Sequence, residues 1–171
     1  MNIRFTGFGG QGIVLSGVIY GWAAILDGKN AIQTQSYGSE ARGGSCKCDV
    51  IIQDSYIHEL EPSDIDILIA FSQPAYDTYS PHLRPEGTLF IDEDLVQAGS
   101  KKENIYAIPA TDLAYKKMNR KIMANIIMLG YLTQKTNIIS AGSVEKSIRN
   151  YVPAKTIDEN LKAFRIGLEL P

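Results

Sequence analysis

The sequence predicts an α/β fold, namely a three-layer, Rossmann-like domain with a mostly parallel sheet and some antiparallel strand pairs. Short apolar runs of strand length alternate along the chain with longer helical segments, which is the pattern of βαβ units. The first run, residues 2–6, enters the loop Gly7-Phe8-Gly9-Gly10-Gln11-Gly12, and this loop enters the apolar segment 13–26. A strand, a glycine turn and a helix in that order build an anion site at the helix start.

The first half of the chain then reads as a series of strands. Residues 30–35 and 45–53 are expected as two strands on either side of a loop, and residues 56–59 as a short strand after the turn at Asp54. These strands are expected to add the antiparallel pairs. Residues 65–71 are apolar except for Asp66, as in a central strand that is covered on both faces.

The remaining elements follow from proline, glycine and helical periodicity. Pro74 stands at a first helical position, so a helix is expected from there to about residue 83, followed by strands at 88–92 and 105–108. Residues 121–133 are apolar on most sides and predict a buried helix. A short helix is expected over 143–151. The capping box Thr156-x-x-Glu159 predicts the start of an amphipathic closing helix.

Length and composition indicate one domain over residues 1–171 in an ordinary globular protein. The chain has 44% apolar and 21% charged residues and a net charge of −2. Without a basic excess, nucleic acid is not an expected partner. The apolar segment 13–26 is too short to span a bilayer, and no signal peptide opens the chain. We therefore expect a cytoplasmic protein that does not bind membranes.

The cysteines and histidines predict neither a metal site nor a catalytic residue. Cys46 and Cys48 would point to one face of a strand, where two small buried thiols are the favoured interpretation. Together with His58 and His82 they match no known metal-ligand spacing. Neither histidine has a nucleophile at a recognised spacing.

The glycine loop leaves several ligands open. Gly7, Gly9 and Gly12 match G-x-G-x-x-G, but the second strand ends without the acidic residue that grips a dinucleotide ribose, which disfavours NAD and FAD. Ile13 follows where a P-loop needs lysine, which argues against nucleotide hydrolysis. A phosphate-bearing ligand on Gly7, Gly9, Gly10, Gln11 and Gly12 remains, with the Gln11 amide donating to an anion or to a neighbouring chain. The alternative is that the glycines serve only close packing.

Two motifs together give a more specific indication. The loop GFGGQG of residues 7–12 is followed by QSYGSEARGG at residues 35–44, and further matching stretches lie at 67–77, 121–130 and 160–164. Over essentially its whole length the chain resembles the gamma subunit of 2-oxoacid:ferredoxin oxidoreductases, most closely the 2-oxoglutarate type.

The resemblance implies one part of a larger enzyme. In that family a hetero-oligomeric complex decarboxylates a 2-oxoacid on thiamine diphosphate, passes electrons through iron–sulfur clusters to ferredoxin, and hands the acyl group to coenzyme A. Thiamine diphosphate and the clusters would lie on the alpha, beta and delta-type partner subunits. This chain would bind no cofactor tightly, would help to assemble the complex and to bind or cover coenzyme A at its surface, and would be inactive alone. A stand-alone NAD- or FAD-binding oxidoreductase and a pure assembly module are the alternatives.

Further site candidates lie in the second motif and in a basic cluster. Arg42 suits a carboxylate or phosphate, and Gly43 and Gly44 allow close backbone approach. We expect Tyr37, Glu40 and Arg42 to face partner subunits near the coenzyme A or oxoacid path, or else Glu40 and Arg42 to pair on a solvated loop. Lys121 is a candidate phosphate contact, although a solvated helix face is the favoured interpretation of the cluster 116–121. For the acidic residues 92–94, a solvated turn is favoured over a ligand site.

Overall fold

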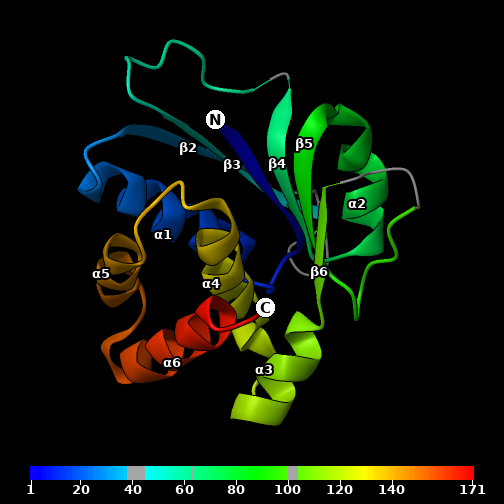
Figure 1. Ribbon diagram of the computed structural model, residues 1–171, viewed down its shortest axis with the longest axis vertical. Helices are drawn as coiled ribbons and strands as arrows, with labels where there is room; N and C mark the ends of the chain where they lie inside the picture. Colours follow the sequence, from blue (N-terminus) through cyan, green and yellow to red (C-terminus); the bar gives the residue numbers. More distant parts are fainter. Residues whose placement is uncertain (38–44, 63, 100–103) are drawn as a thin grey trace.

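The described residues form a six-stranded sheet in the order β2-β3-β1-β4-β5-β6 (Figure 1). The computed structural model describes residues 1–37, 45–62, 64–99 and 104–171. The strands are β1 (Asn2–Phe8), β2 (Asn30–Tyr37), β3 (Ser45–Gln53), β4 (Ile65–Ala70), β5 (Leu83–Asp92) and β6 (Ile105–Ile108). Four of them, β1, β4, β5 and β6, run parallel, whereas β3 is antiparallel to both β1 and β2.

This arrangement confirms the predicted mixed sheet, with one error. The strands on either side of residues 38–44 pair antiparallel, as expected. Residues 56–59 form no strand, so the third antiparallel pair was wrong. The physical reason is that β3 already has β1 on one side and β2 on the other, which leaves no vacant edge for a returning strand.

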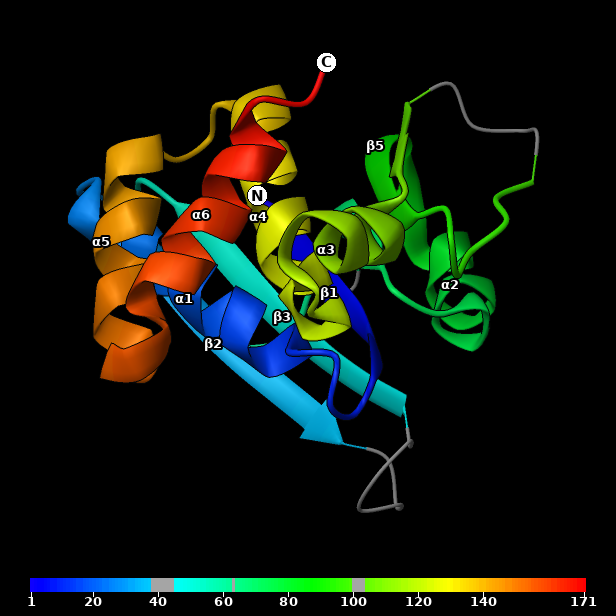
Figure 2. The ribbon, with the colours of Figure 1, turned by 90° about the horizontal axis from the view of Figure 1, so that it is seen from below.

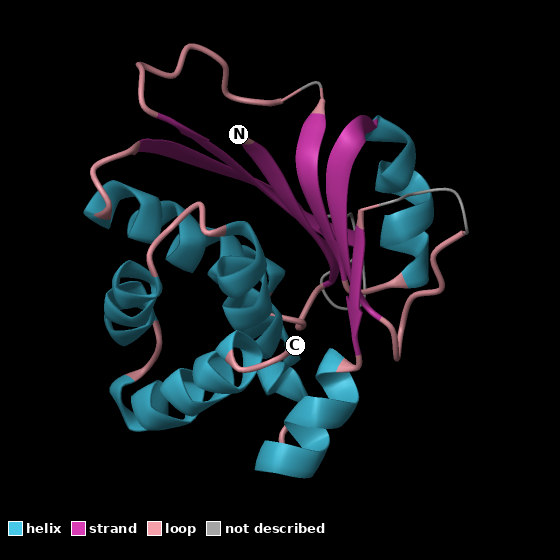
Figure 3. Ribbon diagram, viewed as in Figure 1, coloured by secondary structure: helices cyan, strands magenta, loops and turns pink. Residues whose placement is uncertain are grey.

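The helices are divided unequally between the two faces of the sheet. They are α1 (Ile13–Leu26), α2 (Gln73–Tyr79), α3 (Ala110–Met118), α4 (Ala124–Thr136), α5 (Ala141–Tyr151) and α6 (Ile157–Leu168). Helix α2 lies on one face, while α1 and α4 cover the other with α5 and α6 outside them (Figures 2 and 3). The predicted three layers are therefore present.

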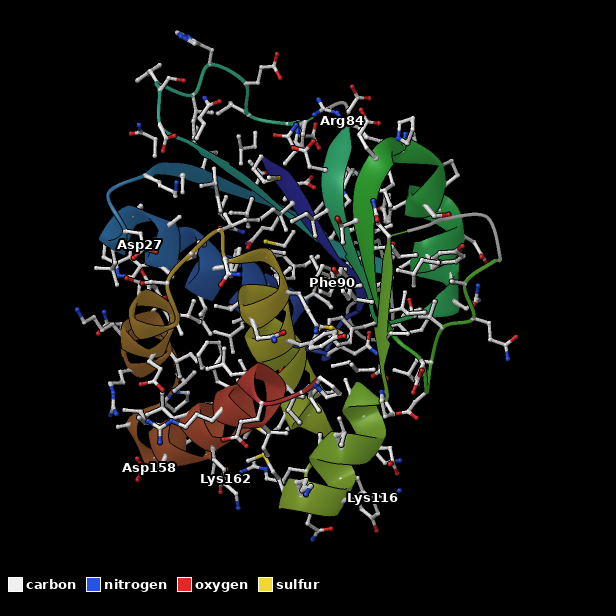
Figure 4. The ribbon with its side chains drawn as sticks, in the orientation of Figure 1. Asp27, Arg84, Phe90, Lys116, Asp158 and Lys162 are labelled. Atoms are coloured by element: carbon white, nitrogen blue, oxygen red, sulfur yellow. The ribbon has the colours of Figure 1, made fainter. Side chains whose placement is uncertain are left out.

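Each face of the sheet has its own apolar core. The smaller core, under α2, includes Leu68 and Leu89. The larger core lies between the sheet and the helices α1 and α3 to α6, with Phe90 inside it (Figure 4). Within this core α4 and α6 pack backbone against backbone. A Cβ atom placed on Gly167 would lie 1.9 Å from the carbonyl oxygen of Ile127, so only glycine permits this crossing.

Several predicted boundaries differ from the structure. Helix α2 is one short helix followed by a 3-10 turn at 80–82, and β5 begins at Leu83 rather than at residue 88. The buried helix expected from residue 121 starts as a 3-10 turn, 121–123, and continues as α4. Among the described residues, none of the helices has both the length and the apolar character needed to cross a membrane.

The predicted capping box at the start of α6 is wrong. The hydroxyl of Thr156 donates to the carbonyl oxygen of Pro153, 2.9 Å away, and makes no cap hydrogen bond to the helix. The carboxylate of Glu159 instead pairs with Arg120 from the segment between α3 and α4. A tertiary ion pair has taken the side chain that local capping needed.

The two cysteines lie on the same face of β3, as predicted. Both are free and buried. A Cβ atom on Gly17 of α1 would lie 2.2 Å from the sulfur of Cys48, so the thiol fills the space between helix and sheet. Burial raises the pKa of Cys48 to about 11. In the described part of the chain, no group of three or more His, Cys, Asp and Glu side chains is arranged to hold a metal ion.

Candidate functional site

The glycine loop lies where the sheet changes the direction of its connections. Strands β1 and β4 are parallel neighbours, yet α1 follows β1 onto one face and α2 follows β4 onto the other. The carboxyl ends of two such strands diverge into a crevice, which is where open α/β sheets bind ligands. The predicted loop therefore lies at the crevice between the carboxyl ends of β1 and β4.

Three glycines shape the backbone of this loop. Gly10 and Gly12 have φ angles of 98° and 75°, which side chains of L-residues rarely adopt. Gly12 is the N-cap of α1 and offers no side-chain cap to the helix. At Gly7, the space that a Cβ would occupy is filled by the Gln11 side chain, whose Oε1 atom would be 2.4 Å away. The loop thus places bare backbone at a helix start.

Gln11 holds this loop against the neighbouring strand. Its Oε1 atom accepts a hydrogen bond of 2.6 Å from the backbone N–H of Phe8, and its Nε2 atom donates to the carbonyl oxygen of Phe71 at 2.9 Å. The side chain therefore links the carboxyl end of β1 to that of β4. The Gln11 amide is thus a positioning group, and its predicted contact with an anion or another chain remains a prediction.

A buried asparagine supports the loop from below, and the sequence analysis missed it. Asn125 of α4 is 4% exposed and donates from Nδ2 to the carbonyl oxygen of Gly12 at 3.2 Å and to the hydroxyl of Ser16 at 3.3 Å. Asn125 is the one amide side chain in the largely apolar run 122–132, and this was the available signal, because a buried polar side chain needs partners.

Two cavities flank the loop. The smaller, about 290 Å³, is lined by Gly10, Gln11, Phe71 and Lys121. The Lys121 ammonium lies 5.7 Å from the centre of the Tyr115 ring, a cation–π contact. Of the predicted cationic candidates, Lys121 is therefore brought to the glycine loop.

The larger cavity, about 410 Å³, opens on the other side of the loop. It is lined by Gly9, Gly10 and Gly12, by Cys46, and by Arg120. Most of the remaining lining is apolar and comes from α1 and from the junction of α5 with α6. The guanidinium of Arg120 at its rim is paired with Glu159. Lys116, by contrast, points to solvent from α3 and pairs with Asp112, as expected of a solvated face (Figure 4).

The described residues that flank the second motif lie at the end of the sheet where the glycine loop begins. Tyr37 at the end of β2 pairs with Cys46, and Ser45 at the start of β3 pairs with Phe8, the last residue of β1. Glu40, Arg42, Gly43 and Gly44 lie outside the described residues, and the predictions made for them remain predictions.

Two acidic residues at the end of β5, Asp92 and Asp94, accept hydrogen bonds from the start of α3. Asp92 is fully buried, and its Oδ2 atom accepts hydrogen bonds from Thr111, 2.5 Å from the hydroxyl and 3.2 Å from the backbone N–H. Asp94 accepts a 2.7 Å hydrogen bond from the backbone N–H of Asp112. Burial raises the pKa of Asp92. The interpretation as a solvated turn is wrong for Asp92. Its carboxylate and that of Asp94 accept hydrogen bonds from backbone N–H groups in the first turn of α3, which have no partner within the helix.

The sheet order also bears on a dinucleotide. In a Rossmann site the strand that presents the ribose-binding acid lies next to β1. Here the antiparallel strand β3 separates β1 from β2. Because this topology removes the second strand from the crevice, it argues against NAD or FAD.

Comparison with known proteins identifies the family and agrees with the fold. The family model described as pyruvate ferredoxin/flavodoxin oxidoreductase matches residues 2–170. The 2-oxoglutarate synthase subunit KorC of Methanocaldococcus jannaschii is 48% identical over 173 residues, covering 99% of this chain and 92% of the relative. Relatives at 26% to 32% identity are named for ketoisovalerate, indolepyruvate and pyruvate.

Two solved structures share the fold. The gamma subunit of a keto/oxoacid ferredoxin oxidoreductase from Geobacter sulfurreducens superposes with a TM-score of 0.84 at 41% identity, over 98% of this chain and 96% of that chain. The 2-oxoglutarate:ferredoxin oxidoreductase from Magnetococcus marinus, solved with 2-oxoglutarate, coenzyme A and succinyl-CoA bound, gives 0.87 at 24% identity, over 98% of this chain and 30% of that chain. The chain therefore belongs to the pyruvate ferredoxin/flavodoxin oxidoreductase family, as a gamma subunit of the 2-oxoacid:ferredoxin oxidoreductases.

Proposed function

We propose that this gamma subunit serves a complex that oxidises 2-oxoglutarate to succinyl-CoA, with ferredoxin as electron acceptor. The observation in support is that four relatives named for 2-oxoglutarate are 35% to 48% identical to this chain, whereas the relatives named for other oxoacids are 26% to 32% identical. The complex, reconstituted with its companion subunits, should show a higher kcat/KM for 2-oxoglutarate than for pyruvate or 2-oxoisovalerate. A higher value for either competitor would refute the substrate assignment.

Within the complex, this chain helps to bind or cover coenzyme A at the glycine loop. The single observation that supports this role is the convergence, at the crevice between β1 and β4, of a helix start, bare glycine backbone and the cation Lys121. Coenzyme A carries a pyrophosphate and a further phosphate, and backbone N–H groups with a lysine suit such anions. When bound, it accepts the acyl group; the residues of this chain hold and orient it.

The redox cofactors belong to the companion subunits in this proposal. Two buried thiols at one face of β3 are too few for a [4Fe–4S] cluster, and the high pKa of Cys48 opposes the thiolate that iron needs. The isolated chain should therefore reduce no acceptor at the expense of an oxoacid.

Lys121→Met in the reconstituted complex tests the coenzyme A role. Loss of one charged phosphate contact should raise the KM for coenzyme A by about tenfold, since 1.4 kcal/mol corresponds to a factor of ten. The KM for the oxoacid should stay unchanged, because this proposal places the thiamine diphosphate on which the oxoacid reacts on companion subunits. Lys116→Met is the matched control, as this lysine also lies on the α3–α4 side of the molecule but points to solvent. An unchanged KM for coenzyme A in the Lys121 variant would refute the proposed contact.

A pure assembly role is the second candidate, and one observation favours it. The side chains of Gln11 and Asn125 form hydrogen bonds with backbone groups of the loop, so the loop keeps its shape without a ligand. In that case neither substitution changes the KM for coenzyme A, yet the complex still needs this chain to form. Omission of this chain from the reconstitution tests the assembly role, because the remaining subunits should then fail to form the complex. Titration of the assembled complex with coenzyme A, with the unmodified chain and with Lys121→Met, tests the binding role.

A further inference from the structure

Helix α1 has apolar side chains on every side, although one of its sides is open to solvent. None of its 14 residues is charged. Gly17 and Gly21 face β3, Ser16 and Tyr20 face α4, and the carbonyl of Ile19 accepts a hydrogen bond from Ser147 of α5. A helix that is apolar all round is normally buried all round.

The remaining side of α1 is an exposed apolar stripe. Val18, Trp22 and Ile25 are spaced four and three apart, which places them on one face of the helix, and Leu26 extends this stripe. Trp22, Ile25 and Leu26 are 37%, 44% and 42% exposed. Tyr151 of α5 continues the surface, because its ring lies 5.9 Å from that of Trp22, edge to face. A patch of this kind on a chain in solution marks an interaction site.

The edge of the sheet beside this stripe lacks the usual protection. Strand β2 is an outer strand with α1 lying over it (Figure 2). It pairs with β3 over eight residues without a bulge, and within Asn30–Tyr37 there is no charged residue and no proline. In the described residues its outer backbone groups have no strand partner. Natural edges are blunted by charges, prolines or bulges unless another chain covers them.

The apolar surface is continuous with the cavity at the glycine loop. Val14 and Leu15, at the start of α1, line the 410 Å³ cavity, and Val152, next to Tyr151, lines the same cavity. A protein seated on the stripe would therefore also form a wall of the candidate coenzyme A site.

We propose that the surface formed by the α1 stripe, Tyr151 and the β2 edge is the docking face for a larger companion subunit of the same oxidoreductase. The companion presents an uncharged, apolar surface with an extended segment that adds to β2. This inference rests on the proposed function, since it assumes the complex. Relatives indicate the occupant: the match covers 36% of the ketoisovalerate oxidoreductase subunit VorA and 30% of the Magnetococcus marinus chain. In those proteins the same fold is one part of a chain about three times longer, so there the fold belongs to a larger polypeptide of the same enzyme.

The test compares two pairs of exposed apolar side chains in the reconstituted complex. Trp22→Glu with Ile25→Glu places two charges on the docking face. Tyr56→Glu with Leu60→Glu is the matched control, because these side chains are 76% and 66% exposed on the segment between β3 and β4. The first variant should weaken assembly by about 100-fold or more, and the control by less than about threefold. Circular dichroism of both variants verifies folding.

A second measurement needs no substitution. The sequence contains one tryptophan, so a chain labelled with 5-fluorotryptophan has a single ¹⁹F resonance from Trp22. Addition of unlabelled companion subunits should shift this resonance. An unchanged resonance in the assembled complex, or equal assembly of both double variants, would overturn the inference alone.

Two other outcomes are distinguishable. In the isolated chain, the resonance could shift with concentration while light scattering detects dimers. This result would assign the surface to a second copy of the chain and refute its assignment to a companion subunit. Failure of the unmodified chain to join the complex would overturn the proposed function and this inference with it.

Discussion

Substitution of Gly12 by alanine tests how the glycine loop is held. At this position φ is 75°, and a Cβ would lie 2.2 Å from the Nδ2 atom of Asn125. The backbone strain costs about 1–2 kcal/mol. Displacement of the amide also breaks its hydrogen bonds to Gly12 and Ser16, at about 0.5–1.5 kcal/mol each. Gly12→Ala should therefore lower the free energy of unfolding by about 2–5 kcal/mol.

Gly10→Ala is the matched control for backbone strain. Its φ is 98°, but a Cβ there would meet no atom within 4 Å. This variant should lose only about 1–2 kcal/mol. Urea denaturation followed by circular dichroism measures both, provided that the m-values agree.

The double variant Gly12→Ala with Asn125→Ala isolates the contact. In the double variant the truncated side chain at position 125 leaves room for the new Cβ. The losses of unfolding free energy of the two single variants should therefore sum to about 1–3 kcal/mol more than the loss of the double variant. Equal losses for Gly10→Ala and Gly12→Ala, with additive effects in the double variant, would refute the role assigned to Asn125.

Three further predictions concern the frame around the site. Burial opposes ionisation of Asp27, but hydrogen bonds from Ser143 and Ser140 hold its pKa below the ordinary value. The stabilisation of the fold by the ionised Asp27 is therefore complete above about pH 4 and declines as the pH falls through the lowered pKa. Asp27→Asn should lower the free energy of unfolding by about 1 kcal/mol at pH 7, and denaturation curves below about pH 4 should show a smaller difference. Gly167→Ala should lower the thermal midpoint, since overpacking costs about 1–3 kcal/mol, whereas Gly142→Ala in α5, where a Cβ meets nothing, should not; equal midpoints would contradict the packing argument. Cys48 should resist alkylation at pH 8 in the folded chain and react after unfolding, as mass spectrometry would show.

The sequence alone predicted the elements whose cause is local. The strand, loop and helix of residues 2–26 follow from a short apolar run, a cluster of glycines and a longer apolar segment without charged residues. The shared face of Cys46 and Cys48 follows from the period of a strand. The two motifs at 7–12 and 35–44 were sufficient to indicate the family.

What the sequence could not provide lies in pairs of residues far apart along the chain. Asn125 forms a hydrogen bond with Gly12, 113 positions away, and Asp27 forms one with Ser143, 116 positions away. Glu159 pairs with Arg120, 39 positions away, instead of capping its own helix. Strand β3 lies between β1 and β2, and no local propensity specifies this order. Local chemistry thus determined where the loop and the helix begin, and only the packing of helices on the sheet decided which side chains support the loop, because those contacts form after the chain has folded back on itself.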